Sequence, residues 1–440
     1  MGESTSTGEE VGEVGGEVKV GIQPCPECGA EIRVDARFVV WCAACDWNID
    51  ATPQEEPNQL ERARRALARR HGEKLLAEVM DGQNLHARRD APSVLAYAIA
   101  LAVHGVTLAL AMGGIWCLLS GRGGGAIVFG VILLVMAWGF RPRAPRLPAD
   151  ALVLHRADAP ELYALVDQVA QVVGTRGVDL IWVDAGINAS VMSYGLRGRR
   201  LLTLGLPLWE SLTPQQRIAL LGHELGHYSN GDTRHGLVVA TAYRTLTTWH
   251  YSFAPTARPS AVEMVVNVVY VVPRLLVLGL LSLLDHLTLR ATQRAEYLAD
   301  REAARAASTE AAVGLMDRLL IMDSAAVALR REVNGAALTG SYAARKADAG
   351  SDDLWKRLAA HMASVPEYEY ERQRRVGARA GHSVDSTHPP THLRRTCLLA
   401  GPPMPAAVVT DGDREQRIAA ELAGVRIKVA RRIVREGFDG

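Results

Sequence analysis

Two apolar runs separated by a short glycine-rich break dominate the hydrophobic pattern of the N-terminal third. The first, Val94–Leu119, is apolar apart from His104 and Thr107. At about 1.5 Å per residue, a helix of this length exceeds the roughly 30 Å hydrocarbon core of a bilayer. The second, Ala126–Phe140, reaches spanning length only if the preceding glycines join it. We expect a transmembrane hairpin over residues 93–140, and the alternative is a buried helical pair in a soluble protein.

The arginines around these runs predict their orientation. The loop between the runs carries a single arginine, Arg122. The two flanks close to the runs carry five: Arg88, Arg89, Arg141, Arg143 and Arg146. Cytoplasmic flanks are enriched in Lys and Arg, and no secretory signal pattern opens the chain. We therefore expect a multi-pass protein of a bacterial plasma membrane, with the N-terminus and the region after the hairpin in the cytoplasm.

Helical and strand periodicities alternate after the hairpin. Apolar positions three and four apart predict a helix over Ala159–Gly174. Short apolar runs predict strands at Leu180–Val183 and Leu201–Leu204, with an extended edge segment over Asn188–Leu196 between them. The sequence Thr-Pro-Gln-Gln at 213–216 is typical of a helix start. The pattern predicts a mostly α fold with a small β-sheet, together with multi-pass membrane helices.

Two later apolar runs are interrupted by polar residues. Leu237–Ala254 contains an arginine and a histidine, whereas Val262–Leu284 is more apolar but contains Pro273 and Arg274. A charged side chain within a span is costly unless it faces protein or water. We expect membrane-associated helices at about residues 237–286, including a kinked span or a re-entrant pair with Arg274 turned inward.

Three segments outside the apolar runs are polar or basic. Residues 1–20 are rich in Gly and Glu and are expected to form a disordered tail. Residues 53–92 predict a basic juxtamembrane helical linker, and residues 410–440 a basic amphipathic C-terminal helix. The formal net charge of the 440 residues is +1, which gives no reason to expect nucleic acid as a partner.

Four of the six cysteines form two Cys-x-x-Cys pairs near the N-terminus, Cys25 with Cys28 and Cys42 with Cys45. This spacing predicts a zinc ribbon over residues 21–52, in which four thiolates close a structural zinc site. Two interpretations stay open: the ribbon recognises a protein partner, or the metal only stabilises a module too small to fold alone. Its two basic residues make nucleic-acid binding unexpected.

The helix predicted to start at residue 213 runs into the sequence His-Glu-Leu-Gly-His at 223–227. Positions four apart share one helix face, so His223 and His227 can bind one metal ion with Glu224 beside it. Two ordinary helical histidines would give the same spacing. Downstream, Glu296 can supply a third ligand, and Asp300, one turn later, can hydrogen-bond a ligand imidazole. The alternative for this acidic pair is a solvated face balanced by neighbouring arginines.

These motifs resemble the HtpX-type membrane metallopeptidases, a family that also includes the CAAX prenyl proteases. The matching segments, in order, are Ile187–Ser190, 223–227, Gly231-Asp232, Glu296–Asp300, and Thr387–Pro390 with Arg394. The resemblance covers about Ala91 to Leu399. It implies a zinc metallopeptidase domain over residues 150–400 with an α+β, gluzincin-like core. Ser190 departs from the family pattern, which usually has an aromatic residue there.

The resemblance also implies roles for residues that local patterns do not single out. His388 would be a catalytic residue that stabilises the tetrahedral oxyanion. Arg394 and Asp232 would support the site from outside the ligand set. Asn188 and Ala189 would bind an extended substrate as an added strand.

The combined expectation is a membrane-embedded zinc endopeptidase that hydrolyses peptide bonds of membrane or misfolded proteins, with a zinc-activated water and Glu224 as general base. It would hold two zinc ions, one catalytic and one structural. Its partners would be a protein or peptide substrate, the lipid bilayer and, on one interpretation, a protein bound by the ribbon. The alternatives are a non-catalytic membrane scaffold that uses the ribbon for binding, and a CAAX-type prenyl protease.

Overall fold

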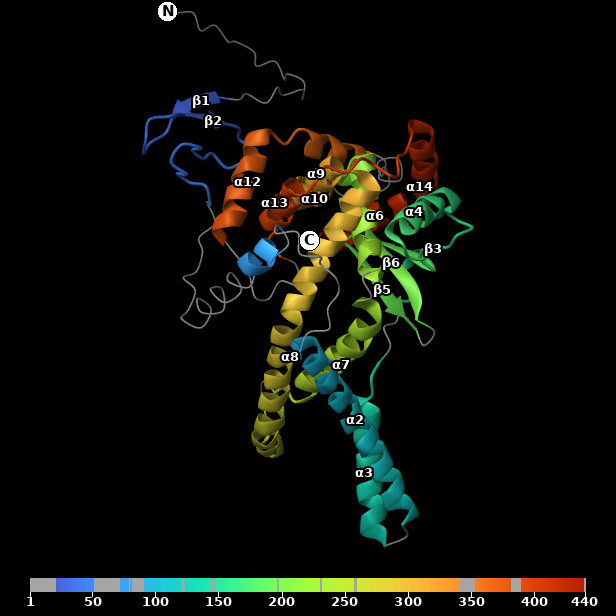
Figure 1. The fold of residues 1–440 in the computed structure, drawn as a ribbon. Coiled ribbons are helices and arrows are strands. Elements are labelled where there is room, and N and C mark those ends of the chain that lie inside the picture. The colour runs from blue at the N-terminus through green and yellow to red at the C-terminus, as the bar shows by residue number, and fades with distance from the viewer. Residues whose placement is uncertain are drawn as a thin grey trace, which may run out of the picture.

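The computed structural model has a globular body from which four helices project at one end (Figure 1). The described residues are 21–50, 72–78, 80, 91–120, 123–143, 147–195, 198–229, 232–256, 259–339, 353–380 and 389–438. The expected disordered tail and most of the expected juxtamembrane linker lie outside them. The fold is mostly helical with a small sheet, as the sequence predicted.

The body contains one four-stranded mixed sheet with the order β3-β4-β6-β5. Its strands are β3 (Leu152–Leu154), β4 (Leu180–Asp184), β5 (Ala189–Tyr194) and β6 (Arg199–Gly205). The two central strands are parallel and the outer pairs antiparallel. Strand β5 lies at one edge, where the sequence predicted an extended edge segment.

Helix α6 (Pro214–Ser229) begins at the predicted signal. The Thr213 N–H donates to Gln216 Oε1 at 3.0 Å, and the Gln216 N–H donates to Thr213 Oγ1 at 3.4 Å, so each residue caps the other. Every residue from Ile218 to Gly226 is buried in the body. Helix α6 is therefore an internal helix, in which His223 is buried and His227 is partly exposed.

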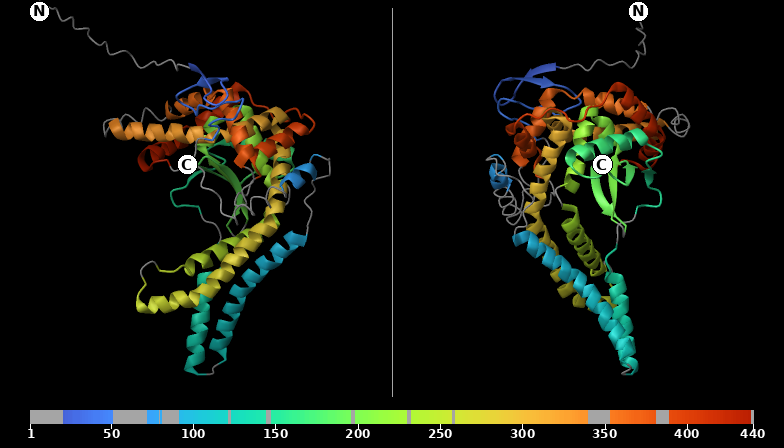
Figure 2. Two further views of the ribbon diagram at one scale, coloured as in Figure 1. Left: turned by 90° about the vertical axis from the view of Figure 1, so that its left-hand side faces the viewer. Right: turned by 45° about the vertical axis from the view of Figure 1, so that its right-hand side comes forward.

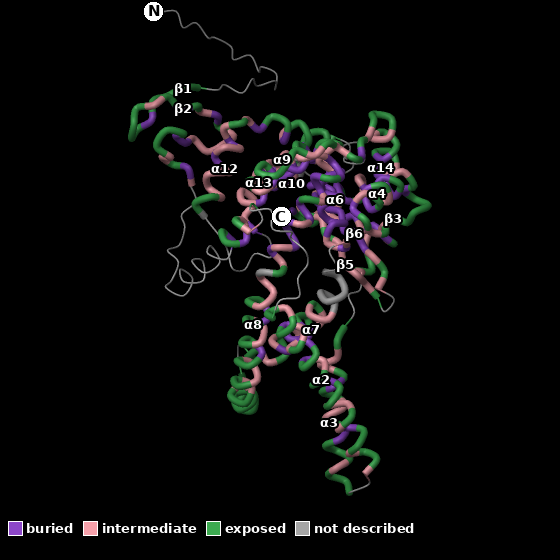
Figure 3. The backbone as a smooth tube through the Cα atoms, viewed as in Figure 1, coloured by how far each residue is buried: buried purple, intermediate pink, exposed green. Residues whose placement is uncertain are grey.

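Helix α8 (Ala261–Ala307) is a single 47-residue helix that links the projecting helices to the body (Figure 2). It begins at a Ser260–Glu263 capping box and continues through Pro273. The expected re-entrant pair is therefore wrong, and Arg274 is half-buried on the continuous helix. The N-terminal part exposes apolar side chains such as Val268, whereas the C-terminal part is buried in the body (Figure 3).

The other projecting helices are α2 (Ala91–Leu119), α3 (Gly124–Phe140) and α7 (Asp232–Ser252). Helices α2 and α3 form a tight hairpin, since a Cβ at Gly114 would lie 2.9 Å from the Gly130 carbonyl oxygen. Among the described residues, α2 and α8 are long and apolar enough to cross a membrane, and α3, with 17 residues, is shorter. Their apolar side chains are largely exposed, which soluble proteins avoid on this scale.

A short helical segment at residues 72–78, within the expected juxtamembrane linker, contacts α8 through Leu75 and Tyr297. Further helices complete the body around α6. They are α4 (Pro160–Val173), α5 (Leu206–Ser211), α9 (Thr309–Leu320), α10 (Met322–Thr339), residues 353–363, α12 (Glu367–Ala380), α13 (Thr391–Ala400) and α14 (Gly412–Glu436). The predicted C-terminal helix is thus α14, and it packs on the body through an apolar face that includes Ile418 and Leu422. The Glu421 carboxylate accepts hydrogen bonds from the first two N–H groups of α4, at 2.7 and 3.0 Å.

Candidate metal centres

The close crossing of α6 and α8 positions the first candidate centre. A Cβ at Gly222 would lie 2.9 Å from the Ala303 Cα, and one at Gly226 would lie 3.0 Å from the Ala299 Cα. Ordinary carbon–carbon contacts are about 3.5–4.0 Å, so only glycine fits at these two positions. The two helix backbones therefore approach closely, and the histidines of α6 face the acidic residues of α8.

The crossing brings together the three residues predicted to bind a catalytic metal. The two Nε2 atoms of His223 and His227 are 3.3 Å apart, and the Glu296 carboxylate oxygens lie 3.5 and 3.6 Å from them. A tetrahedral zinc ion with bonds of 2.0–2.1 Å requires its ligand atoms to be about 3.3–3.4 Å apart. The arrangement therefore fits zinc. The partial exposure of His227 leaves one side of the site accessible.

Asp300 and Arg394 hold the first histidine from behind. The Asp300 Oδ1 lies 3.0 Å from His223 Nδ1, and Arg394 donates to both Asp300 oxygens at 2.6 and 2.8 Å. Burial raises the pKa of Asp300, but the charge and hydrogen bonds of Arg394 outweigh it and hold that pKa well below its usual range. Asp300 thus remains an ionised acceptor for His223 Nδ1–H, and His223 Nε2 is left for the metal.

Of the other predicted site residues, the structure describes Glu224 and Arg394 fully, the backbone of Asp232, and not His388. Glu224 is buried on α6 directly after His223. Arg394 comes from α13 and contacts Asp300, from α8. His388 lies outside the described residues, and Asp232 begins α7 with its side chain outside the description.

Asn188 and Ala189 lie where strand β5 begins, at the edge of the sheet. The Asn188 carbonyl oxygen accepts a hydrogen bond from the Gly205 N–H at 2.8 Å, so its backbone faces β6. Because pairing alternates along an antiparallel strand, the backbone groups of Ala189, Val191 and Ser193 point away from the sheet. Ala189 can therefore pair with a substrate strand through its backbone, and Asn188 only through its exposed side chain.

One contact that the sequence did not reveal ties the edge strand to the metal helix. The Tyr228 hydroxyl donates to the Met192 carbonyl oxygen at 2.8 Å, and the Arg200 guanidinium lies 4.3 Å from the centre of the Tyr228 ring. The two bonded residues are far apart in sequence, so no local pattern could show this contact. By contrast, the two glycines of α6 are four residues apart, and this spacing could have predicted the close helix crossing.

The four N-terminal cysteines form the second candidate centre. The Cys25–Cys45 and Cys28–Cys42 sulfur pairs are 3.7 and 3.6 Å apart, and all four sulfurs lie within 4.8 Å of one another. These distances are too long for disulfides and match the roughly 3.8 Å edge of a zinc–thiolate tetrahedron.

The cysteines are carried by two turns next to a short hairpin. Strand β1 (Gly21–Pro24) pairs with β2 (Glu31–Val34), and the first cysteine turn joins them. The N–H groups of Gly29 and Asp46 donate to the carbonyl oxygens of Cys25 and Cys42, and both residues have left-handed backbones. These features are typical of metal-binding knuckles.

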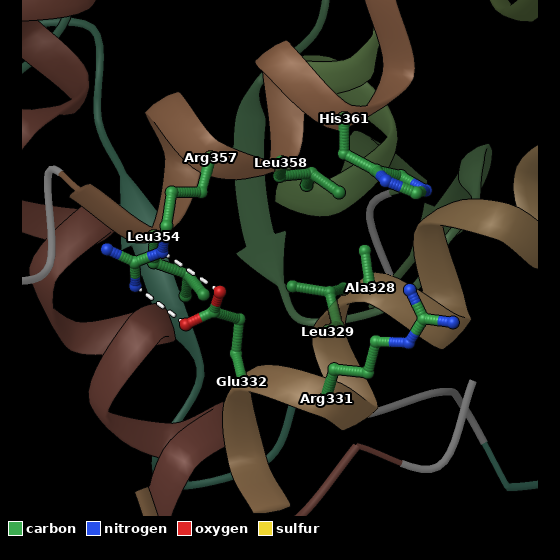
Figure 4. A pocket seen from close by; sticks show the side chains of 8 residues that line it. All are labelled: Ala328, Leu329, Arg331, Glu332, Leu354, Arg357, Leu358 and His361. Atoms are coloured by element: carbon green, nitrogen blue, oxygen red, sulfur yellow. Dashed lines mark hydrogen bonds and ion pairs between the residues drawn. The ribbon is translucent and has the colours of Figure 1, made fainter. Parts of the chain in front are cut away.

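A pocket elsewhere in the body contains none of the predicted site residues (Figure 4). It lies between α10 and residues 353–363, with a floor of leucines and a rim of charged side chains. The lining residues are Ala328, Leu329, Arg331, Glu332, Leu354, Arg357, Leu358 and His361. The Arg357–Glu332 ion pair, at 2.7 Å, closes one side of it. The metal clusters, and not this pocket, are the chemically distinctive sites.

Comparison with known proteins gives the family. No curated protein and no solved structure matches the chain. A family model described as peptidase family M48 matches residues 157–400, which is more than half of the 440 residues. The match includes both helices of the candidate metal site and the arginine behind it. The chain therefore belongs to peptidase family M48.

Proposed function

We propose that this protein is a membrane-embedded zinc endopeptidase that cleaves membrane or misfolded proteins. The observation that carries the proposal is the spacing of the two imidazole nitrogens and the carboxylate of His223, His227 and Glu296, 3.3–3.6 Å apart at a crossing of two buried helices. Family membership supports a metallopeptidase. Three ligand residues with a partly exposed His227 leave a fourth position open, which catalytic zinc sites have and closed structural sites lack.

Each residue of the site has a role in peptide hydrolysis. A zinc ion bound by the three ligands would lower the pKa of a water molecule and polarise the scissile carbonyl. Glu224, next to His223, would take the proton of the attacking water and deliver it to the leaving amine. Asp300, kept ionised by Arg394, would hold His223 in the tautomer that presents Nε2 to the metal. His388 is our candidate for stabilising the oxyanion.

The edge strand β5 would hold the substrate in an extended conformation. Ala189, Val191 and Ser193 direct their backbone groups outward, so a peptide can add there as a further strand. The Tyr228–Met192 hydrogen bond fixes this strand relative to the metal helix. Backbone pairing recognises any extended peptide, which suits a peptidase with many protein substrates.

We favour the HtpX-type branch over the CAAX-type branch of the family. In the described part of the chain, two helices are long and apolar enough to cross a membrane, and the CAAX branch usually has more spans. Helix α8 runs from the exposed apolar region into the metal site. A membrane protein substrate would therefore meet the site close to the bilayer surface.

Metal dependence tests this proposal. Purified full-length protein in detergent should cleave casein, lose that activity when a chelator removes zinc, and regain it when zinc is restored. Persistence of cleavage after the metal content of the His–Glu site reaches zero would overturn the proposal. Magnesium added in place of zinc is the matched control, because oxygen-preferring magnesium does not suit a site with two imidazoles.

Topology is tested separately from activity. A reporter fused after Pro148, between α3 and β3, should report a cytoplasmic location, because basic flanks remain in the cytoplasm. A reporter in the α2–α3 loop should report the opposite side. Equal results for both fusions would contradict the hairpin.

A further inference from the structure

The cysteine ribbon, residues 21–50, lies against α12 of the peptidase domain (Figures 1 and 2). The Phe38 ring meets the Tyr368 ring edge-on, with centroids 6.4 Å apart. Arg375 of α12 lies 5.3 Å from the centre of the Trp41 ring. The ribbon therefore has an aromatic contact surface, and part of the peptidase domain already occupies it.

The strongest contacts come from the metal-binding turn itself. Arg375 donates to the Ala43 carbonyl oxygen and to the Asp46 carboxylate, both at 2.8 Å, and Arg379 donates to the other Asp46 oxygen at 2.6 Å. Ala43 lies between the ligands Cys42 and Cys45, and Asp46 directly follows them. The turn that would wrap the metal thus also presents the groups that α12 binds.

A buried arginine anchors the other side of the contact. Arg372 and Glu369 form a bidentate pair at 2.7 and 2.8 Å, and Arg372 Nη1 donates to the Ile49 carbonyl oxygen at 2.8 Å. Both charged side chains are buried. A buried guanidinium requires acceptors for its donors, and the ribbon supplies one of them. Undocking would remove that acceptor.

Helix α12 is in turn connected to Arg394, the arginine that supports the metal site through Asp300. The Asp317 carboxylate of α9 accepts from Arg374 of α12 at 3.1 Å and from Arg395 of α13 at 2.8 Å. The neighbour of Arg395 is Arg394, which binds Asp300 behind His223. A continuous series of ion pairs and packed helices therefore runs from the ribbon to the catalytic metal site.

We propose that the ribbon is an internal, metal-dependent clamp on α12. With a metal ion bound to its four thiolates, the turn from Cys42 to Asp46 is ordered and docks on α12, which holds α13 and Arg394 in position. Loss of the metal unfolds the turn, releases α12 and loosens the support of the catalytic site. The partner of the ribbon is this chain's own helix. The docking does not depend on peptidase activity, but its effect on catalysis rests on the proposed function.

Hydrogen exchange of the full-length protein in detergent tests the clamp. The variant Cys28→Ser should lose one bound zinc per chain, and peptides from α12 should exchange at least about tenfold faster than in the wild type. Arg375→Ala with Arg379→Ala should keep both zinc ions and show the same faster exchange. Glu27→Gln, an exposed change inside the first cysteine turn, is the matched control and should behave as wild type.

The outcomes are distinct. Unchanged α12 exchange in Cys28→Ser, despite the lost zinc, would overturn the clamp. Unchanged exchange in the double arginine variant would do the same, and this variant leaves the cysteines intact if Cys28→Ser fails to fold. If the wild type cleaves casein, the double arginine variant should be several-fold slower. An inactive wild type with the expected exchange pattern would refute the proposed function and leave the clamp standing.

Discussion

Replacing Gly222 by alanine should separate the two halves of the catalytic metal site. The new Cβ would lie 2.9 Å from the Ala303 Cα and 3.1 Å from the Ala306 Cβ. Ordinary contacts are about 3.5–4.0 Å, so α6 must move from α8 by about 0.5–1 Å. Metal sites tolerate about ±0.2 Å in their bond lengths. The shift therefore exceeds what the ligands on the two helices can absorb.

The magnitude of the effect follows from these distances. Overpacking costs about 1–3 kcal/mol, and the change from glycine to alanine returns about 1 kcal/mol of helix propensity. The free energy of unfolding should therefore fall by no more than about 2 kcal/mol. Displaced ligand geometry should weaken zinc binding by about 10–100-fold, as for other losses of ligand orientation. In free energy this loss of affinity is about 1.4–2.7 kcal/mol, similar in size to the loss of stability, so zinc affinity is measured directly on the folded protein.

Competition with a fluorescent chelator measures both zinc sites of one sample, so the ribbon serves as an internal reference. Gly222→Ala should weaken the His–Glu site and leave the cysteine site unchanged. Gly424→Ala is the matched control, because it changes a helical glycine whose Cβ would meet open space. Wild-type zinc affinity at the His–Glu site of Gly222→Ala would refute the reasoning about the helix crossing.

Three further changes test separate parts of the account. Tyr228→Phe removes the hydrogen bond to Met192 and should raise the KM for an extended peptide several-fold with little change in kcat, and an unchanged KM would contradict a role in positioning β5. Glu421→Gln weakens the two hydrogen bonds that cap α4 and should lower the free energy of unfolding by about 1–2 kcal/mol. Urea titration measures this change, and an unchanged free energy would show that the cap does not stabilise the fold. Gly114→Leu cannot fit the α2–α3 hairpin, where a Cβ would meet the Leu134 side chain at 2.8 Å, and should lower the Tm in detergent. An unchanged Tm would contradict the close packing.

Local periodicity was enough to predict the elements that carry the site. Helix α6 begins at Pro214 because the capping pair of Thr213 and Gln216 acts within one turn. The amphipathic pattern of α14 likewise reflects a face that is buried in the structure. Such signals depend only on residues that are neighbours in the chain, so a single sequence is enough to predict them.

Features that depend on contacts between residues far apart in the sequence could not be predicted. Helix α8 continues through Pro273, although proline removes one helical hydrogen bond and sequence rules favour a break. Glu296 was predicted as a ligand, but the close crossing of α6 and α8 at glycines, which brings it to the histidines, could not be predicted from local patterns. Arg375 and Asp46 are 329 residues apart, so nothing near either of them indicated that the ribbon docks on α12.

The most direct test of the central claim compares Glu224→Gln with the wild type at equal zinc content. Zinc bound by each protein is measured first, and casein cleavage is then followed in the same samples. We expect full occupancy of the His–Glu site in both proteins and cleavage about 10²–10⁴-fold slower in the variant, the usual contribution of a general base. Equal cleavage by the two zinc-loaded proteins would show that Glu224 is not the general base and that the His–Glu site is not the source of the activity.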